Sequence, residues 1–427
     1  MKYQRSAGAL LFLFIITLTG LAQVTAPNYD ESKIPAYTLP ALLSTQQGTP
    51  VTTARQWETV RRQEVFQLFE QHVYGKTPDQ KIPVRFEVTS TTAGALNGLA
   101  IRKEITVHIG KDANGPKIYI LLYVPVNRTS PAPAFAGMNF YGNHTVWNDP
   151  GISLAHGWIS NNEGFRITEN KATEGSRGVR SSRWPVDKIL ARGYALATIY
   201  YGDTDPDFDD GFQNGIQPLF YKKGQSKPAP DEWGSIGAWA WGMSRAMDYL
   251  EQDQDIDASR VALMGHSRIG KAALWAGASD DRFAVVISNN SGCGGAALSR
   301  RQYGETVAVI NNAFPHWFSD NFTQYNHNES KLPVDSHMLI ALMAPRPVYI
   351  ASAEEDRWAD PKGEFLSGVH ASPVYKLYNL IGLENMEMPG IHQPILNTIG
   401  YHIRAGKHDV TTYDWERYMD FTDKFMR

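Results

Sequence analysis

Cysteine is almost absent from this sequence, and neither sign of charge is in surplus. Cys293 is the one cysteine among 427 residues, so no disulfide can form within the chain and stability must come from the hydrophobic core. The 41 basic and 44 acidic residues give a net charge of −3, so the charge balance indicates neither nucleic acid nor an anionic membrane as a partner. After the first 22 residues, no apolar run is long enough to cross a bilayer. The hydrophobic share of 42% is ordinary for a globular protein.

The first 22 residues have the order of a secretory signal peptide. Lys2 and Arg5 precede an apolar run over 7–18, and Gly20-Leu-Ala22 follows, with small residues at the positions that a signal peptidase reads. A membrane anchor is the alternative, but the run is short for a span. We therefore expect cleavage after Ala22, export to a periplasm or to the outside of the cell, and no membrane attachment afterwards.

Short apolar runs and helical patterns alternate along most of the chain. Two runs of alternating polar and apolar residues, 84–90 and 100–109, predict half-buried antiparallel strands. Near-continuous apolar runs predict parallel strands that are buried on both faces, at 118–125, 195–201, 261–265, 284–288 and 347–351. Helical spacing occurs at 53–72, 184–192, 237–251 and 269–277. We therefore predict an α/β fold, a three-layer αβα sandwich whose mostly parallel central sheet carries an N-terminal antiparallel extension.

Two long polar segments, 141–183 and 202–230, interrupt this pattern. We interpret both as ordered loops over the face of the sheet where ligands bind. The chain shows no internal repeat, no low-complexity tract and no linker. We therefore expect residues 23–427 to form a single domain.

The sequence around Ser267 has the pattern of a nucleophile elbow. An apolar strand stops at Gly265, and a helix-prone stretch begins directly after the serine. Such a strained turn raises the serine hydroxyl above the sheet and points the next backbone N–H at a developing oxyanion. The second glycine, Gly270, falls one residue later than in the usual G-x-S-x-G spacing, and a turn with a capping serine is the alternative. We predict that Ser267 is the nucleophile of an α/β-hydrolase fold, with 23–427 as its catalytic domain.

A serine nucleophile needs a base, which this fold places near the C-terminus. Among twelve histidines, His408 follows a strand-like run, 399–403, and precedes a helix-like run, 415–425, where the base belongs. We predict His408 as the base. Structural positions are expected for the others near it: His266 packed under the elbow, His402 within the strand, and His370 and His392 in loops or on the surface.

The acid that orients the base should follow an earlier strand. An acidic stretch follows the strand predicted at 347–351, and its Asp356 lies a few residues past the strand end, within reach of the base. Glu354, Glu355 and Asp360 compete for this role, although a solvated acidic loop suits Glu355 and Asp360 well. We predict Asp356 as the acid.

These residues belong to motifs of a known family. The run Gly265-His-Ser-Arg-Ile-Gly-Lys271 resembles the G-C-S-R-x-G-K signature of the glucuronoyl esterases, carbohydrate esterase family 15. Further similar motifs occur at 289–301, 303–306, 314–317, 332–338, 344–347 and 354–360, and the resemblance covers most of the chain after the signal peptide. The bacterial members look most similar. The resemblance implies an enzyme that needs no metal or cofactor and cleaves the ester between a lignin alcohol and the 4-O-methyl-glucuronic acid branches of xylan.

The resemblance also implies a role for each matching residue. Ser267 matches the nucleophile and His408 the base. Arg268 matches an arginine that supports the oxyanion with its side chain and its N–H, and a guanidinium suits the negative charge that develops on a uronate ester. Sugar binding is implied for Lys271, Glu305 and Trp358, for which a solvated helix residue, a surface charge and a packing residue are the respective alternatives.

Two positions depart from the family pattern. Where many members have a catalytic glutamate, this chain has Asn290, which cannot carry the charge. The acid role then falls to Asp356, or the chain has no strong acid and is weakly active. His266 stands where fungal members have a disulfide-bonded cysteine, and with one cysteine in the chain that crosslink is absent.

We therefore expect a monomeric, exported esterase that acts by two-step acyl transfer through Ser267. Its expected substrate is glucuronoxylan or another lignin–carbohydrate ester. Another carbohydrate esterase on the same fold, such as an acetyl-xylan esterase, is the first alternative, and a peptidase is disfavoured because we find no additional domain or lid. Asn290 motivates a third alternative, a glycan-binding protein with a relict site.

Overall fold

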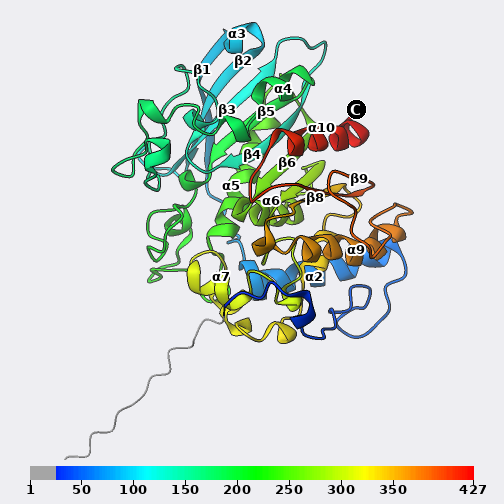
Figure 1. The fold of residues 1–427 in the computed structure, drawn as a ribbon. Helices are drawn as coiled ribbons and strands as arrows, with labels where there is room; N and C mark the ends of the chain where they lie inside the picture. The colour runs from blue at the N-terminus through cyan, green and yellow to red at the C-terminus, as the bar shows by residue number, and fades with distance from the viewer. Residues whose placement is uncertain (1–25) are drawn as a thin grey trace, which may run out of the picture.

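The computed structural model describes residues 26–427, which are built around one ten-stranded sheet. Its strands lie in the order β1-β2-β3-β5-β4-β6-β7-β8-β10-β9 (Figure 1). Their bounds are Val84–Gly94 (β1), Ala100–Ile109 (β2), Lys117–Pro125 (β3), Ala132–Asn139 (β4), Ala195–Tyr200 (β5), Ile256–His266 (β6), Val285–Asn289 (β7), Val348–Ala353 (β8), Ile395–Leu396 (β9) and Ile399–Arg404 (β10). The predicted signal peptide, residues 1–22, lies outside the described residues.

Parallel pairing joins the middle of the sheet to its C-terminal side. Strands β5, β4, β6, β7, β8 and β10 run parallel in that order. Strands β1, β2, β3 and β5 pair antiparallel, and β9 is antiparallel to β10. The mostly parallel sheet with an N-terminal antiparallel extension is therefore confirmed. The prediction that 118–125 is a parallel strand is wrong, because a continuous apolar run reports burial on both faces, and β3 is buried in this way between two antiparallel neighbours.

Helices cover both faces of the sheet, which confirms the predicted three layers. Their bounds are Ala54–Gln56 (α1), Arg62–Phe69 (α2), Ala95–Gly98 (α3), Val186–Ala191 (α4), Ser235–Leu250 (α5), Arg268–Ser279 (α6), Val307–Ala313 (α7), Ser336–Ala341 (α8), Pro361–Leu377 (α9) and Thr412–Met426 (α10). Helices α2, α5, α6, α8 and α9 pack into a larger hydrophobic core, and α4 and α10 pack into a smaller core on the other face (Figure 1).

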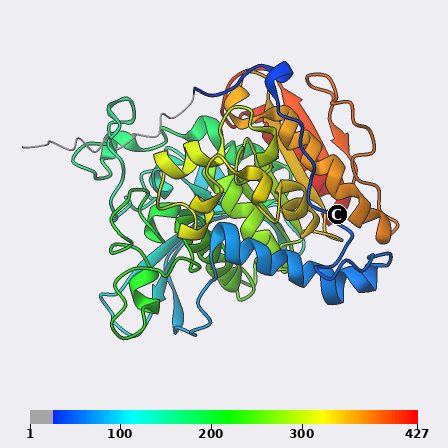
Figure 2. The ribbon, with the colours of Figure 1, turned by 90° about the horizontal axis from the view of Figure 1, so that it is seen from below.

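The helix predicted at 53–72 is one continuous helical run with two wider turns. Segments Trp57–Arg61 and Glu70–Tyr74 are π-helical and flank α2. The run crosses the view in blue in Figure 2. Within residues 26–427, no helix combines the length and the hydropathy of a membrane span.

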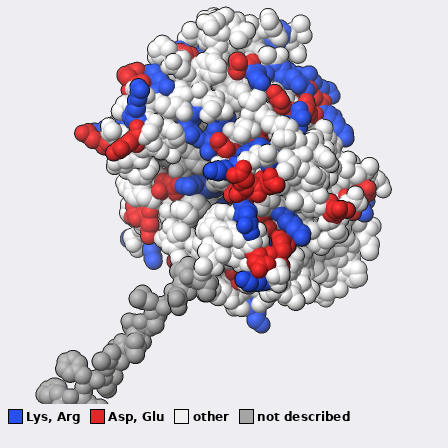
Figure 3. All heavy atoms as spheres, viewed as in Figure 1, with Lys and Arg blue, Asp and Glu red and all other residues white. Residues whose placement is uncertain are grey.

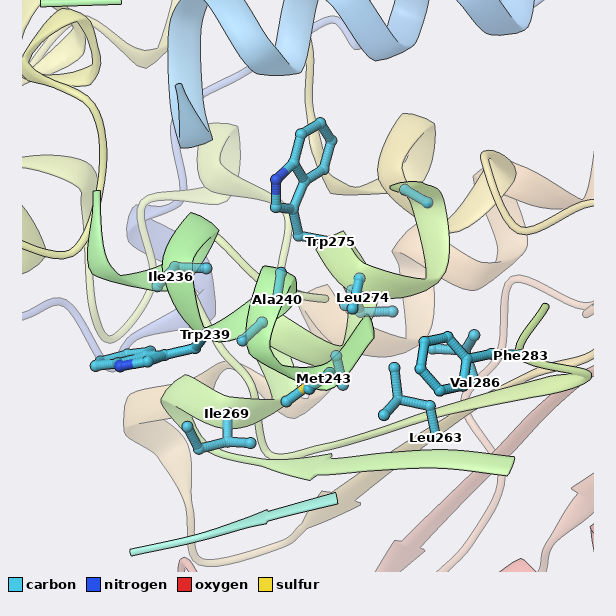
Figure 4. Close-up of a cluster of buried hydrophobic side chains, with 14 of the residues drawn as sticks. Ile236, Trp239, Ala240, Met243, Leu263, Ile269, Leu274, Trp275, Phe283 and Val286 are labelled. Atoms are coloured by element: carbon cyan, nitrogen blue, oxygen red, sulfur yellow. The ribbon is translucent and has the colours of Figure 1, made fainter. Parts of the chain in front are cut away.

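Side chains of the buried strands alternate between the two cores. In β6, Val261 and Leu263 belong to the larger core, whereas Ala262 and Met264 belong to the smaller one. Figure 4 shows part of the larger core, where Leu263 lies beneath side chains of α5 and α6 that include Met243 and Leu274. This packing fixes α6, the helix that follows the strand of the predicted nucleophile.

Strand β4 was not foreseen in the sequence, although it lies directly beside β6. Its residues, Ala-Pro-Ala-Phe-Ala-Gly-Met-Asn, include types that are depleted in strands. Small residues are required there, because a Cβ on Gly137 would lie 2.6 Å from the carbonyl oxygen of Met264. Close approach of two backbones, rather than strand propensity, explains this composition.

Candidate active site

Ser267 alone forms the turn between strand β6 and helix α6. Its φ of 58° and ψ of −131° are strained for a residue with a side chain, as in a nucleophile elbow. Glycines allow the close packing around it. A Cβ on Gly265 would lie 2.1 Å from the carbonyl oxygen of Ile269, and a Cβ on Gly270 would lie 3.0 Å from the Cβ of Ser291. The shifted second glycine of the motif therefore lies where α6 approaches the loop after β7.

His408 lies between Ser267 and Asp356 and contacts both. Its Nε2 is 2.9 Å from Ser267 Oγ, and its Nδ1 is 2.6 Å from Asp356 Oδ2. Asp356 follows β8 and is buried, whereas His408 follows β10 and is partly exposed. Because an ionised carboxylate only accepts hydrogen bonds, the Nδ1 proton faces Asp356 and Nε2 is available to accept the serine proton. The residues predicted as nucleophile, base and acid thus form one hydrogen-bonded line.

Asn290 makes a second hydrogen bond to the same carboxylate. Its Nδ2 donates to Asp356 Oδ2 over 2.7 Å from the end of β7, where the backbone φ is 47°. The position that lacks the family's glutamate is therefore in contact with the acid. The relict-site alternative rested on a missing acid, and a carboxylate that reaches His408 removes that premise.

The competing acidic residues are placed away from the base. Glu354 and Glu355 are exposed. Asp360 is 2% exposed, and it pairs with Arg301 over 2.8 Å. It also accepts from the backbone N–H of Gly363 over 3.0 Å and so caps α9. The interpretation of Asp360 as a solvated loop residue is therefore wrong, because it is a buried cap of α9 and a partner of Arg301.

Arg268 reaches the cavity with its guanidinium held by Asp207 and aromatic rings. Its Nη1 donates to Asp207 Oδ2, and its Cζ lies 4.8 Å from the ring centre of Trp317. Asp207 also accepts from His316 Nε2 over 2.9 Å and from Trp317 Nε1 over 2.8 Å. Burial alone would raise the pKa of the Asp207 carboxyl, but the hydrogen bond from His316 and the charge of Arg268 hold it well below its usual range. Asp207 therefore stays ionised and fixes the arginine.

Lys271 and Glu305 form a buried pair in the same cavity. Lys271 Nζ donates to the carbonyl oxygen of Ser291 over 2.6 Å and lies 3.4 Å from Glu305 Oε2, and each side chain of the pair is 5% exposed. The interpretations of Lys271 as solvated and of Glu305 as a surface charge are therefore wrong. Trp358 is 39% exposed, so it lies at the rim and is not a packing residue of the core.

A cavity of about 320 Å³ contains all seven predicted site residues in its lining. The lining is Ser267, Arg268, Lys271, Asn290, Ser291, Gly292, Glu305, Phe314, Trp317, Asp356, Trp358, Ala359 and His408. Neither of the two long loops expected over the ligand face supplies a lining residue. The second of them contributes Asp207, which acts on the cavity through Arg268. Within residues 26–427, no three His, Cys, Asp or Glu side chains gather as metal ligands would.

A buried ion pair holds the loop that carries His408. Arg404 donates from Nη2 to the carbonyl oxygens of Lys407, over 3.0 Å, and of Asp409, over 2.6 Å. Its Nε lies 2.8 Å from Asp414 Oδ2, on α10. Arg404 thus fixes the backbone on both sides of His408. Arg404 was not predicted as a site residue, because its only signal in the sequence is an arginine at the end of a strand that precedes the base.

His266 packs under the elbow, as its position suggested. Its Nδ1 is 2.6 Å from Asn289 Oδ1, and its ring centre is 4.5 Å from that of His408. Burial and the adjacent His408 lower the pKa of His266 well below its usual value, so the ring is neutral. His402 is buried in β10 as expected, and His392 is in an exposed loop, but His370 lies half-buried on helix α9 and not in a loop.

Comparisons with known sequences point to one family. A family model described as "Glucuronyl esterase, fungi" matches residues 196–379. The curated carbohydrate esterase MZ0003, from an unknown prokaryotic organism, is 52% identical over 405 residues, which are 95% of this chain and 93% of that protein. A curated 4-O-methyl-glucuronoyl methylesterase of Schizophyllum commune is 27% identical over 364 residues, which are 83% of this chain and 77% of that protein.

Solved structures agree over nearly the whole chain. A promiscuous esterase of carbohydrate esterase family 15 from a marine bacterial metagenome is 52% identical, with a TM-score of 0.89 over 94% of this chain and 100% of its own. A glucuronoyl esterase from Solibacter usitatus is also 52% identical, with a TM-score of 0.87 over 92% of this chain and 99% of its own.

Proposed function

This chain belongs to the glucuronoyl esterases of carbohydrate esterase family 15, and we propose that it hydrolyses the ester between 4-O-methyl-glucuronic acid branches of glucuronoxylan and lignin alcohols. One arrangement carries the proposal: the line Ser267–His408–Asp356 opens into the cavity that also holds Arg268 and the buried pair of Lys271 and Glu305. The three hydrogen-bonded residues can catalyse ester hydrolysis. The charged and polar side chains of the cavity suit a uronate sugar better than an apolar acyl chain.

Acylation begins when Ser267 Oγ attacks the C6 carbonyl carbon of the uronate ester. Nε2 of His408 takes the serine proton, and the carbonyl π electrons move onto oxygen. Asp356 stabilises the imidazolium through the hydrogen bond that its Oδ2 accepts from His408 Nδ1, and Asn290 donates to the same oxygen. The oxyanion accepts hydrogen bonds from Arg268, whose backbone N–H is the first of α6 and has no acceptor within the helix.

Collapse of this intermediate breaks the bond between the carbonyl carbon and the alcohol oxygen. His408 Nε2 gives its proton to that oxygen, so the alcohol leaves neutral and Ser267 carries the glucuronoyl group. Water then adds to the same carbonyl carbon while His408 takes one of its protons. The second collapse returns the proton to Ser267 Oγ and releases the free uronic acid.

Sugar selection depends on the buried pair. Lys271 Nζ has three N–H donors, and Ser291 and Glu305 occupy two of them. The third N–H of Lys271 can donate to one sugar hydroxyl, and the Glu305 carboxylate can accept from another hydroxyl. The pair can therefore bind adjacent hydroxyls of the uronate. Trp358 at the rim covers one face of the sugar.

The proposal also includes the place and form of the protein. Export rests on the basic, apolar and small-residue order of residues 1–22. A single domain over 23–427 is supported by one continuous sheet whose strands come from 84–404. We infer a monomer that acts on its glycan substrate without another protein.

The test is the initial rate of hydrolysis of the benzyl ester of glucuronic acid by the wild type and by Ser267→Ala. We expect turnover by the wild type and a loss of at least about 10³-fold in the variant. A relative is described as promiscuous, so simple acetyl esters are measured in parallel. Cleavage of acetyl esters together with no turnover of the uronate ester would leave a serine esterase and contradict the glucuronoyl assignment.

A further inference from the structure

Two large aromatic side chains are exposed on the described surface: Trp358, which lines the cavity, and Tyr29, which contacts the neighbour of Trp358, Arg357. Among the exposed large hydrophobic residues of 26–427, only Tyr29, at 38%, and Trp358, at 39%, are aromatic. The other exposed residues of this kind are valine, leucine, isoleucine and methionine side chains from several segments of the chain. Singly exposed aliphatic residues need no explanation, whereas exposed aromatic rings gathered at a cavity mark a binding surface.

A continuous chain of contacts joins these two rings. Arg357, the neighbour of Trp358, donates from Nε to the hydroxyl of Tyr303 over 3.0 Å. Its guanidinium lies 5.1 Å from the ring centre of Tyr29 and 5.9 Å from that of Tyr303. The two tyrosine rings meet edge to face at 6.0 Å. We call Tyr29, Tyr303, Arg357 and Trp358 the aromatic rim.

Backbone contacts join the aromatic rim to Glu305, which is proposed to bind the sugar. Gly304 donates its N–H to the carbonyl oxygen of Asn28 over 2.8 Å, and a Cβ on Gly304 would lie 2.4 Å from the carbonyl oxygen of Trp358. The next residue, Glu305, donates its N–H to that same oxygen over 3.0 Å. The segment 302–306 therefore has Glu305 in the cavity and Tyr303 in the rim.

Ion pairs hold the N-terminal segment in this place. Glu31 lies 2.7 Å from Arg301 Nη2 and 3.2 Å from Lys362 Nζ. Arg301 is itself buried and paired with Asp360. The segment that carries Tyr29, dark blue in Figure 1, is thus fixed to the core of the domain by a buried arginine. A fixed ring loses little conformational entropy when a ligand binds to it.

A second hollow of about 700 Å³ shares segment 302–306 with the cavity, because Gln302 and Thr306 line the hollow and Glu305 lines the cavity. Tyr29, Gln302 and Thr306 line it together with other residues of 26–35 and 309–329. Its lining includes carboxylate, ammonium and amide groups, and basic and acidic side chains also lie near one another on the face drawn in Figure 3. A surface of mixed polar groups with rings at its edge suits a neutral, hydroxyl-rich ligand better than a highly charged one.

We propose that the aromatic rim and this hollow bind the neutral sugar residues of the glycan to which the uronate is linked. The inference rests on the proposed function, because the ester carbonyl at Ser267 orients the substrate. The alcohol must lie near His408, which protonates it, whereas the uronate ring extends toward Lys271 and Glu305. The glycan end of the substrate therefore leaves the cavity past Trp358 and onto the rim.

The experiment compares two substrates, the benzyl ester of glucuronic acid and the same ester carried on a short xylo-oligosaccharide. For Tyr29→Ala we expect kcat/KM on the oligosaccharide ester to fall about three- to tenfold, mainly through KM, with no change on the bare ester. Tyr29→Phe keeps the ring and should behave as the wild type. Met386→Ala removes an exposed side chain elsewhere, 58% exposed, and is the surface control.

Three other results would overturn the inference. Equal losses on both substrates would mean that Tyr29 only supports the cavity, and no loss on either would mean that the rim binds nothing. A loss on a bare glucuronate ester with a bulky biaryl alcohol, but not on the oligosaccharide ester, would assign the rim to the alcohol. If the wild type cleaves neither substrate, the proposed function fails separately. The rim is then tested by calorimetric binding of the unesterified glucuronoxylo-oligosaccharide, where weaker binding by Tyr29→Ala supports it and equal binding overturns it.

Discussion

Asn290 donates a hydrogen bond to Asp356 over 2.7 Å, on the oxygen that also accepts from the base. Within the described residues, the Oδ1 atom of Asn290 is buried and has no partner. The side-chain amide of Asn290 therefore makes its hydrogen bond to Asp356 alone, while its own oxygen stays without a partner among the described residues. A buried unsatisfied oxygen is unfavourable, so its presence beside the acid indicates a functional requirement for the amide.

We expect Asn290→Ala to lower kcat about tenfold with little change in KM. One hydrogen bond to a buried carboxylate contributes about 1.5–3 kcal/mol, and only part of that changes between the ground state and the transition state. Steady-state rates on the benzyl glucuronate ester measure both constants. Asn321→Ala, which removes a surface amide, is the control. An unchanged kcat in Asn290→Ala would show that Asp356 needs no second donor.

Replacing the acid, Asp356, should lower kcat far more than replacing Asn290. Asp356→Asn keeps the shape of the side chain but removes the charge that stabilises the imidazolium and selects its tautomer, so we expect kcat to fall about 10³–10⁴-fold. Glu355→Gln makes the same chemical change on an exposed residue next to it and should leave the rate unchanged. A loss below tenfold in Asp356→Asn would mean that another group orients His408.

The site residues that could be predicted from the sequence are those that lie close to a recognisable strand. Ser267, His408 and Asp356 each follow a strand with a recognisable apolar run, so chain order and spacing were sufficient. Asp207 could not be found in this way, because it reaches Arg268 from 61 residues away along an irregular loop. Strand β4 escaped prediction because close packing against β6 selects small residues there, which resemble a loop in sequence.

The third prediction concerns Arg404, which holds the loop that carries His408. Arg404→Lys keeps a positive charge beside Asp414. One ammonium nitrogen, however, cannot replace both Nε, which contacts Asp414, and Nη2, which donates to the carbonyl oxygens of Lys407 and Asp409. We expect kcat to fall about ten- to a hundredfold because His408 loses its fixed position, while KM stays close to that of the wild type.

Thermal unfolding separates this effect from loss of folded protein. Arg300→Lys alters another buried arginine, which pairs with Asp335, donates to the carbonyl oxygens of Val334 and Leu332 and does not line the cavity, and it serves as the matched control. The two variants should show similar small decreases in Tm, and only Arg404→Lys should lose rate. Equal rates in both variants would contradict a positioning role for Arg404.

The last prediction concerns Glu364, which is buried on α9 behind the active-site loop. Its Oε1 accepts from the N–H of Gly292 over 3.0 Å, and its Oε2 lies 2.6 Å from Ser352 Oγ. Burial raises the pKa of this carboxyl to about 8, and the charge of Asp356 adds to the rise, although the hydrogen bonds from Ser352 and Gly292 oppose it. At neutral pH Glu364 is therefore protonated in the folded protein.

A raised carboxyl pKa makes the protein less stable as the pH rises. In the unfolded chain the pKa has its ordinary value of 4.5, so between this value and about 8 the unfolded state releases a proton that the folded state retains. The contribution to the free energy of unfolding is full below pH 4.5, decreases through this interval and is constant above it. Glu364→Gln has nearly the shape of the protonated acid, keeps one acceptor oxygen beside a donor group and cannot ionise, so it should not show this loss of stability.

We expect the free energy of unfolding of Glu364→Gln, relative to the wild type, to increase by roughly 2–4 kcal/mol between about pH 5 and pH 8. Urea unfolding at a series of pH values measures the difference directly. Glu384→Gln changes an exposed carboxyl and should differ from the wild type by a constant amount over the same range. If the Glu364→Gln difference were also constant, the carboxyl would be ionised in the folded protein. In that case its charge would have to be satisfied by Ser352 and Gly292 alone, despite the burial that both of them share.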